Sequence, residues 1–336
     1  MIIGGRDLTH EHLLIAEIGN NHEGNPKLAL EMVVAAVQAG ADAIKIQVIV
    51  PERLVNRNQT QRIEQLTRFR LPMEVIAEMA EAARSKGALF MASALDIDSL
   101  ESIAPLLDAV KIASGDLDFH PLLARAAGLG KPIILSTGMS TLEEIEASVD
   151  FIASSLTSGL LADRLVLLHC VSLYPAALVD ANLRVIQTLH DRFSLTVGYS
   201  DHTLGIECAV AALGLGARII EKHFTLDKSR SSFRDHALSA DPHDLRRLAD
   251  VIHQYDRMLG SGEKYLSEAE VQMGMNSRRS IVAARDLPAG TQLTMADLDC
   301  IRPRNGLKPA ALPALVGRIL RVALMKHETL LEEHLE

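Results

Sequence analysis

The chain has 336 residues, of which 48% are hydrophobic and 23% are charged, and its formal net charge at pH 7 is −9. This composition excludes an intrinsically disordered chain, and the negative charge argues against a nucleic-acid partner or an anionic membrane surface. No leader pattern opens the chain, no apolar run reaches the ~20 residues of a membrane span, and the three cysteines are widely spaced, so we expect a soluble, cytoplasmic enzyme with reduced thiols.

Eight short apolar runs follow one another along the chain, and most end in a polar or ionisable residue before a helical stretch begins. They cover residues 13–19, 43–48, 88–93, 109–114, 132–137, 165–170, 195–201 and 218–224. The runs lack polar alternation, which is typical of parallel strands that are buried on both faces. A doubly wound sheet has the same rhythm, but no GxGxxG follows the first run. The sequence therefore predicts an α/β fold of the (β/α)8 TIM-barrel class.

Two of the intervening helices have clear end signals. Asn25 suits the N-cap of the first helix, Pro26 its first position and Gly40 its exit. Pro72 opens a later helix and Gly87 ends it.

The chain is longer than the roughly 250 residues typical of a barrel, so a second unit is expected. A last barrel helix around 244–259 precedes a polar stretch without a strand pattern. We expect a catalytic barrel over 1–260, a linker over 261–277 and a small, mostly β domain over 278–336. The strands and turns predicted in that domain lie at 280–284, 286–290, 298–302 and 318–324.

Barrel enzymes carry their chemistry at the carboxyl ends of the strands. His202 and His223 end the seventh and eighth runs. Adjacent strands lie about 4.8 Å apart, so two imidazoles at matching heights can share one divalent ion. Two protein ligands would leave positions open for a substrate, which suits a Lewis-acid site. The alternative for each histidine is a hydrogen-bonded structural or acid/base residue.

Lys45 and Lys111 lie inside apolar runs, where a charge is costly to bury without a partner. An anionic ligand would explain both lysines, although structural ion pairs would as well. Serines at neighbouring strand ends could add donors to the same ligand, or could be turn and cap residues. These serines are Ser114, Ser136 and Ser200.

Four further residues are candidates for contact with a substrate. Glu17 and Asp235 can act as acid/base groups or bind hydroxyls, or else serve as cap or ion-pair residues. Gln47 and Tyr174 have polar tips suited to orienting a substrate, with core packing as the alternative.

Taken in order, several short segments of the chain resemble the N-acetylneuraminate (sialic acid) synthase family. They are 16–24 (AEIGNNHEG), 45–47 (KIQ), 111–116 (KIASGD), 135–139 (LSTGM), 168–170 (LHC), 174–175 (YP), 198–203 (GYSDHT) and 221–225 (EKHFT). Residues 279–336 resemble the C-terminal antifreeze-like (SAF) domain of that family. The resemblance covers nearly the whole chain, and the order of the segments on successive strands makes it specific.

The resemblance implies condensation of phosphoenolpyruvate with an open-chain N-acyl sugar such as N-acetylmannosamine. It implies that His202 and His223 hold a divalent metal, usually Mn²⁺, with Mg²⁺ or Co²⁺ as alternatives. It also implies a homodimer in which the C-terminal domain caps the partner's barrel and Arg302 reaches the sugar. The residues expected to bind phosphoenolpyruvate are Lys45, Ser93, Lys111, Ser114, Ser136 and Ser200, and Asp116 is a further residue expected to bind a substrate. Those expected to face the sugar or its reacting carbonyl are Glu17, Gln47, Tyr174 and Asp235.

The chain departs from the family pattern at several positions near the expected sugar. They are Ser172, Ala94 with Leu95, Phe233 with Arg234, and Ser277. These departures leave the acceptor open, and family members that make legionaminic acid, pseudaminic acid or spore-coat polysaccharide are alternatives.

Two other functions are compatible with parts of the pattern. In a pyruvate aldolase, Lys111 would form a Schiff base, and borohydride trapping would reveal it. A carbohydrate-binding protein on a barrel without activity is the second alternative.

Overall fold

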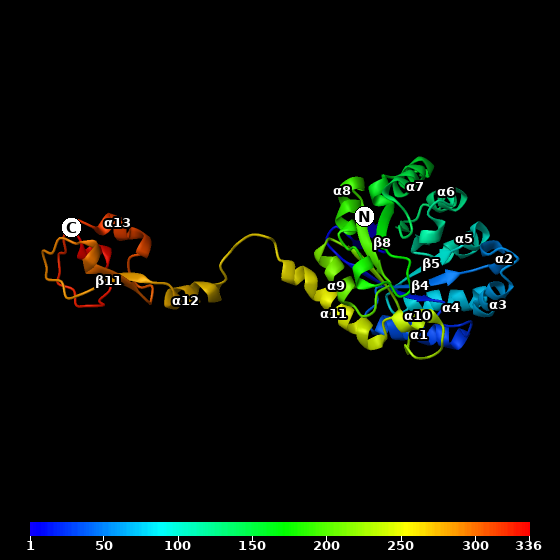
Figure 1. The fold of residues 1–336 in the computed structure, drawn as a ribbon, viewed down its shortest axis with the longest axis horizontal. Coiled ribbons are helices and arrows are strands. Elements are labelled where there is room, and N and C mark those ends of the chain that lie inside the picture. The colour runs from blue at the N-terminus through cyan, green and yellow to red at the C-terminus, as the bar shows by residue number, and fades with distance from the viewer. The chain divides into compact units, whose positions relative to one another are not determined.

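Eight parallel strands of the computed structural model, which describes residues 1–255 and 257–336, close into a barrel in the order β10-β3-β4-β5-β6-β7-β8-β9 (Figure 1). The predicted (β/α)8 fold is confirmed. The strands are β3 (Leu13–Gly19), β4 (Ala43–Val48), β5 (Leu89–Ala94), β6 (Ala109–Ile112), β7 (Ile133–Ser136), β8 (Leu165–Cys170), β9 (Thr196–Asp201) and β10 (Ile219–His223).

Helices surround the barrel, and the connections after β4 and after β10 contain additional helices. The helices that follow the strands are α1 (Pro26–Gln38), α4 (Met73–Arg84), α5 (Ile97–Ile103), α6 (His120–Gly128), α7 (Leu142–Ser155), α8 (Val185–Phe193), α9 (Glu207–Gly214) and α11 (Pro242–Leu259). Between β4 and α4 the chain adds α2 (Pro51–Leu54) and α3 (Thr60–Phe69), and after β10 it adds α10 (Arg234–Leu238). Short 3-10 turns are Ala104–Leu106, Ser114–Asp116, Leu161–Asp163, Leu178–Asp180, Met295–Asp297, Pro309–Ala311 and Glu332–His334.

The end signals of the first helix are confirmed. The Asn25 side chain accepts a hydrogen bond from the Leu28 backbone N–H, and Pro26 occupies the first turn, where its missing N–H costs nothing. Gly40 leaves the helix with a φ of 100°, in the left-handed region that glycine adopts without strain. These signals fix where α1 starts and where the chain turns into β4.

The barrel interior is apolar at the amino ends of the strands. Its buried residues include Leu13, Ile15, Ala43, Met91, Ala109, Ile134, Val166, Leu168 and Ile219. Ile3 and Leu8 join this cluster from a hairpin of β1 (Ile2–Ile3) and β2 (Arg6–Asp7) and are almost fully buried. The hairpin closes the floor of the barrel. It was not predicted, because strands of two residues are too short to show a periodic pattern.

Two residues further along six of the strands, polar side chains replace the apolar ones on the inward face. Successive side chains of a strand point to opposite faces, so Ile15 is followed inward by Glu17 and Ala43 by Lys45. Other pairs of this kind are Met91 and Ser93, Ala109 and Lys111, Ile134 and Ser136, and Ile219 and Glu221. The barrel thus has a dry lower half and a polar mouth.

The chain divides into two compact units, Met1–Leu259 and Gly260–Glu336. The second unit contains α12 (Glu268–Ser277), the antiparallel pair β11 (Ser280–Ala283) and β12 (Leu298–Ile301), and α13 (Leu312–Leu315). The segment predicted as a linker therefore contains a helix, whose N-cap is Ser267. A hydrogen bond joins this helix to the rest of the second unit, because the Arg304 N–H donates to the Met275 carbonyl at 2.7 Å.

The prediction of a strand at 318–324 is wrong. This segment forms only isolated bridges, of Ile319 with Gln292, Leu320 with Leu335, and Leu324 with Leu287. Its backbone groups bond to separate segments in turn, so no continuous ladder can form. Among the described residues, no helix is both long and apolar enough to cross a membrane.

Candidate active site

A cavity of about 340 Å³ opens at the carboxyl ends of the barrel strands. It brings together most of the side chains proposed from the sequence, namely Glu17, Lys45, Gln47, Ser93, Lys111, Ser114, Ser136, Tyr174, Ser200, His202 and His223. A smaller adjoining cavity of about 160 Å³ is lined by Asp235 and shares Gln47, Tyr174 and His223 with the first. Together the two cavities form one polar site, which is lined by residues from all eight strands or from the loops that follow them.

Two carboxylates flank Lys45 inside the site. Its Nζ lies 2.8 Å from Glu17 Oε2 and 3.7 Å from Glu221 Oε2. Gln47 Nε2 donates to Glu17 Oε1 at 3.1 Å. Burial raises the pKa of Glu17. Burial acts in the same direction on Glu221, but the positive charges of Lys45 and Lys111 outweigh it and lower the pKa of Glu221. The site therefore holds one carboxyl group poised to carry a proton and one that stays ionised.

Glu221 was not proposed from the sequence. It accepts a hydrogen bond from Ser200 Oγ at 2.8 Å and lines the cavity. The alternation of β10 could have identified it, because Ile219, Glu221 and His223 occupy successive inward positions.

Lys111 is a buried cation without a carboxylate partner. Only 3% of its surface is exposed, and its Nζ donates to Ser136 Oγ at 2.6 Å and to the Ile112 carbonyl at 2.9 Å. Within the described residues it forms no ion pair. Burial lowers its pKa for that reason. An anionic ligand would supply the missing partner.

Hydroxyl groups and one glycine surround the space beside Lys111. Ser114 Oγ accepts from the Gly138 N–H at 3.0 Å, and a Cβ at Gly138 would lie 2.4 Å from Ser172 Oγ. Any larger residue at position 138 would fill the site. Ser93 Oγ is buried without a hydrogen-bond partner in the described structure, so it is available to a ligand.

His202 and His223 lie side by side, with ring centroids 5.5 Å apart. His202 Nδ1 donates to the Val171 carbonyl at 2.7 Å, which leaves the lone pair on Nε2, and His223 Nδ1 is buried without a partner in the described structure. Burial lowers the pKa of both imidazoles, so both are neutral at pH 7. Neutral rings, one of them fixed by a backbone carbonyl, fit a divalent metal.

Tyr174 packs against the histidine pair from one side. Its ring centroid lies 4.3 Å from that of His202 and 5.9 Å from that of His223. Burial raises the pKa of its phenol, so the hydroxyl remains a donor. The guanidinium of Arg234 lies over the same ring, 4.8 Å from its centroid.

Three residues proposed from the sequence lie outside these cavities. Asp116 is half-buried in the turn after β6, where burial raises its pKa to about 6. Arg302 and Ser277 belong to the C-terminal unit, where Arg302 is exposed after β12 and Ser277 ends α12. The contacts predicted for Arg302 with a sugar stay a prediction.

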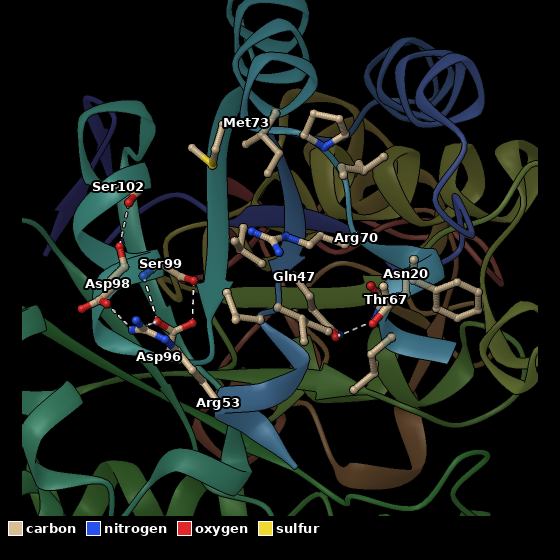
Figure 2. A pocket seen from close by; sticks show the side chains of 18 residues that line it. Asn20, Gln47, Arg53, Thr67, Arg70, Met73, Asp96, Asp98, Ser99 and Ser102 are labelled. Carbon is tan, nitrogen blue, oxygen red and sulfur yellow. Dashed lines mark hydrogen bonds and ion pairs between the residues drawn. The ribbon is translucent and has the colours of Figure 1, made fainter. Parts of the chain in front are cut away.

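A larger cavity of about 580 Å³ lies beside the mouth (Figure 2). Asn20 Nδ2 donates to Gln47 Oε1 at 3.0 Å and links the two regions. On the far wall Arg53 pairs with Asp96 at 3.2 Å and with Asp98, and Asp96 also caps α5 by accepting from the Ser99 N–H. Arg53, Asp96 and Asp98 thus compensate one another on that wall, whereas Ser93 and His223 in the barrel mouth each have a buried polar atom without a hydrogen-bond partner in the described structure.

Comparison with known proteins agrees with both units. The model of the NeuB family matches residues 32–264, and that of the SAF domain matches residues 278–336. The N,N'-diacetyllegionaminic acid synthase of Legionella pneumophila is 40% identical, over 96% of this chain and 94% of that protein. The pseudaminic acid synthase of Campylobacter jejuni is 33% identical, over 95% of each. The solved N-acetylneuraminic acid (sialic acid) synthetase of Leptospira borgpetersenii, 34% identical, superposes with a TM-score of 0.72 over 78% of this chain and 90% of that one.

Proposed function

The chain belongs to the NeuB family, in which its relatives are synthases of sialic, legionaminic and pseudaminic acids, and on that basis we propose that it condenses phosphoenolpyruvate with an open-chain N-acyl sugar. The products are a nonulosonic acid and inorganic phosphate. Since the relative at 40% identity is named for a diacetylated acid, we propose an acceptor with two acylamino groups.

The unpaired charge of Lys111 carries the proposal for phosphoenolpyruvate. Phosphate and carboxylate groups need cations and N–H or O–H donors, and Lys111, Ser114, Ser136 and Ser93 offer them in one buried cavity. Lys45 adds a second ammonium group, which Glu17 and Glu221 share. Each charge-assisted hydrogen bond contributes about 1.5–3 kcal/mol to binding.

The acceptor sugar lies, in this proposal, between the histidine pair and Asp235. Gln47, Tyr174 and Asp235 would orient its hydroxyl groups, because their polar atoms line the smaller cavity. His202 and His223 would hold the divalent ion, with Mn²⁺ as the first candidate. When bound, that ion supplies Lewis-acid polarisation of the sugar's carbonyl.

Glu17 is the group proposed to move a proton. Carbon 3 of phosphoenolpyruvate attacks the aldehyde carbon, whose oxygen gains a proton and becomes a hydroxyl. Water then adds to carbon 2. The bond between carbon 2 and the bridging oxygen breaks, phosphate departs with that oxygen, and carbon 2 becomes a ketone. A carboxyl group with a raised pKa beside Lys45 can give a proton to the aldehyde oxygen as it becomes a hydroxyl, or take one from the water.

Phosphate release tests this function directly. The protein is mixed with phosphoenolpyruvate, Mn²⁺, Mg²⁺ or Co²⁺, and each of three acceptors: N-acetylmannosamine, its 6-phosphate, and a sugar with two acylamino groups. We expect release that depends on acceptor and metal, with the diacylamino sugar turned over fastest. When the bridging oxygen is isotope-labelled, the label should appear in phosphate. Label in the keto acid would contradict the proposed bond cleavage.

Arg302 is proposed to contact the sugar bound in the partner's barrel of a homodimer. Arg302→Ala should raise the KM of the sugar much more than that of phosphoenolpyruvate. Mixing Arg302→Ala with His202→Ala should restore activity, because a mixed dimer has one site with a native barrel and a native cap. Random exchange puts about half of the chains into mixed dimers and makes about a quarter of all sites intact. No recovery despite demonstrated exchange would mean that each cap serves its own barrel.

A further inference from the structure

Arg234 borders three cavities at the mouth of the barrel. It lines the 340 Å³ cavity with the histidine pair and the 160 Å³ cavity with Asp235. It also lines a third cavity of about 780 Å³ between α3 and the segment before α10. Among the described residues no other lines all three, so Arg234 stands where the reacting centre meets the outer part of the site.

The guanidinium of Arg234 is fixed on one side and free on the other. It lies over the Tyr174 ring, and its Nε is 3.3 Å from Asp235 Oδ1. These contacts leave 64% of the side chain exposed. A guanidinium has five N–H groups, so most of them remain available to a ligand.

The short helix α10 holds Arg234 in a defined place. His236, which is fully buried, hydrogen-bonds through Nδ1 with the Thr225 hydroxyl at 2.7 Å and donates from Nε2 to Glu23 at 3.1 Å. Ser239 Oγ donates to the Asp235 carbonyl at 2.6 Å. The position of the guanidinium is therefore set before a sugar binds, which lowers the entropy cost of using it.

Helix α3 faces α10 with further donors. Phe233 packs edge-on against Phe69 of α3, with ring centroids 5.1 Å apart. Arg62 and Arg68 of the same helix line the third cavity. Among the described residues that line it, Glu23 is the one that carries a carboxylate. This end of the site thus carries three arginines and one carboxylate, which suits a ligand that offers oxygen atoms as acceptors.

We propose that Arg234 is a specificity-determining residue whose guanidinium donates hydrogen bonds to the carbonyl oxygen of the acceptor sugar's second acylamino group. The inference rests on the proposed function. At Arg234 itself an amide oxygen fits better than a phosphate, because Asp235 already compensates the charge of this guanidinium and leaves its other N–H groups as directed donors.

Steady-state kinetics of Arg234→Ala and Arg234→Lys test the inference. Loss of hydrogen bonds from a charged group should raise the KM of the diacylamino sugar at least about tenfold. The KM of phosphoenolpyruvate should change less than about twofold, and that of N-acetylmannosamine should rise much less than that of the diacylamino sugar, since neither carries the second acylamino group. Arg234→Lys should recover part of the loss. Arg230→Ala, an exposed arginine of the same loop that lines none of these cavities, is the matched control and should behave as the native protein.

The outcomes separate this inference from the proposed function. If the native protein releases no phosphate with any acceptor, the proposed function fails. If the native protein is active and Arg234→Ala keeps the native ratio of kcat/KM between diacylamino and monoacylamino sugars, the role of Arg234 is overturned. A loss confined to the 6-phosphate acceptor would also overturn it, because the oxygen recognised would then be a phosphate. Thermal melting of each variant shows whether a loss reflects unfolding.

Discussion

Alanine at His202 or at His223 should remove divalent metal binding and, with it, turnover. Each histidine would supply one of the two protein ligands, and the loss of even an outer-shell partner costs about 10–100-fold in metal affinity, so the loss of a ligand should cost at least about 100-fold. Titration of Mn²⁺ into the metal-free protein, followed by calorimetry or by electron paramagnetic resonance, measures the affinity without relying on turnover. His223→Gln, which keeps most of the side-chain volume, controls for packing.

The chain offers a matched control for this experiment. Asp241, His243 and Asp244 bring ligand atoms within 4.8 Å of one another on the barrel unit. Lys228 already pairs with both of these carboxylates, so we expect His243→Ala to bind Mn²⁺ as the native protein does. Native affinity and turnover in both His202→Ala and His223→Ala would place the metal elsewhere.

Replacement of Lys111 by methionine should weaken phosphoenolpyruvate binding by roughly tenfold to 150-fold, the equivalent of a lost charge-assisted hydrogen bond. The same change should not lower the melting temperature, because methionine removes a buried cation that forms no direct ion pair within the described residues. Ligand-induced fluorescence or calorimetry gives the Kd. An unchanged Kd for phosphoenolpyruvate would remove Lys111 from its proposed role.

Lys111 also distinguishes the condensing enzyme from a Schiff-base aldolase. Its lowered pKa favours the neutral amine that such an aldolase needs, so this alternative has a specific observation in its favour. Incubation with pyruvate and borohydride should leave the mass of the chain unchanged if the proposed function is right. A covalent adduct at Lys111 would support the aldolase instead.

The barrel was predictable because its strands begin as apolar runs that end in polar or ionisable residues, a pattern that stands out from the helices between. The structure keeps all eight runs and shortens some of them, as at 109–114, where β6 ends at Ile112 and Ser114 begins a turn. The His202 and His223 pair was predictable for a related reason, since the ends of neighbouring strands lie at one edge.

Other features had no readable pattern. The floor hairpin is too short to be periodic, and the segment at 318–324 has strand-like residues but partners scattered over three segments. Asp235 and Arg234 come close to Tyr174 only through the anchoring of α10 by His236, a contact that spans 213 residues to Glu23. Such long-range contacts depend on the assembled fold and leave no local trace in the sequence.

The groups proposed for phosphoenolpyruvate stand on barrel strands or directly after them, whereas Arg234, which is proposed to choose between sugars, stands on α10 beside α3. The choice of sugar is therefore encoded in part by stretches of the gene that are separate from those of the strands. Mutations in the stretches for α3 and α10 can redirect the enzyme to a new sugar without unpairing a strand of the barrel. Within such a lineage the sugar can change while the chemistry of phosphoenolpyruvate is preserved, so the residues of α3 and α10 carry more information about the acid that a member makes than the barrel strands do.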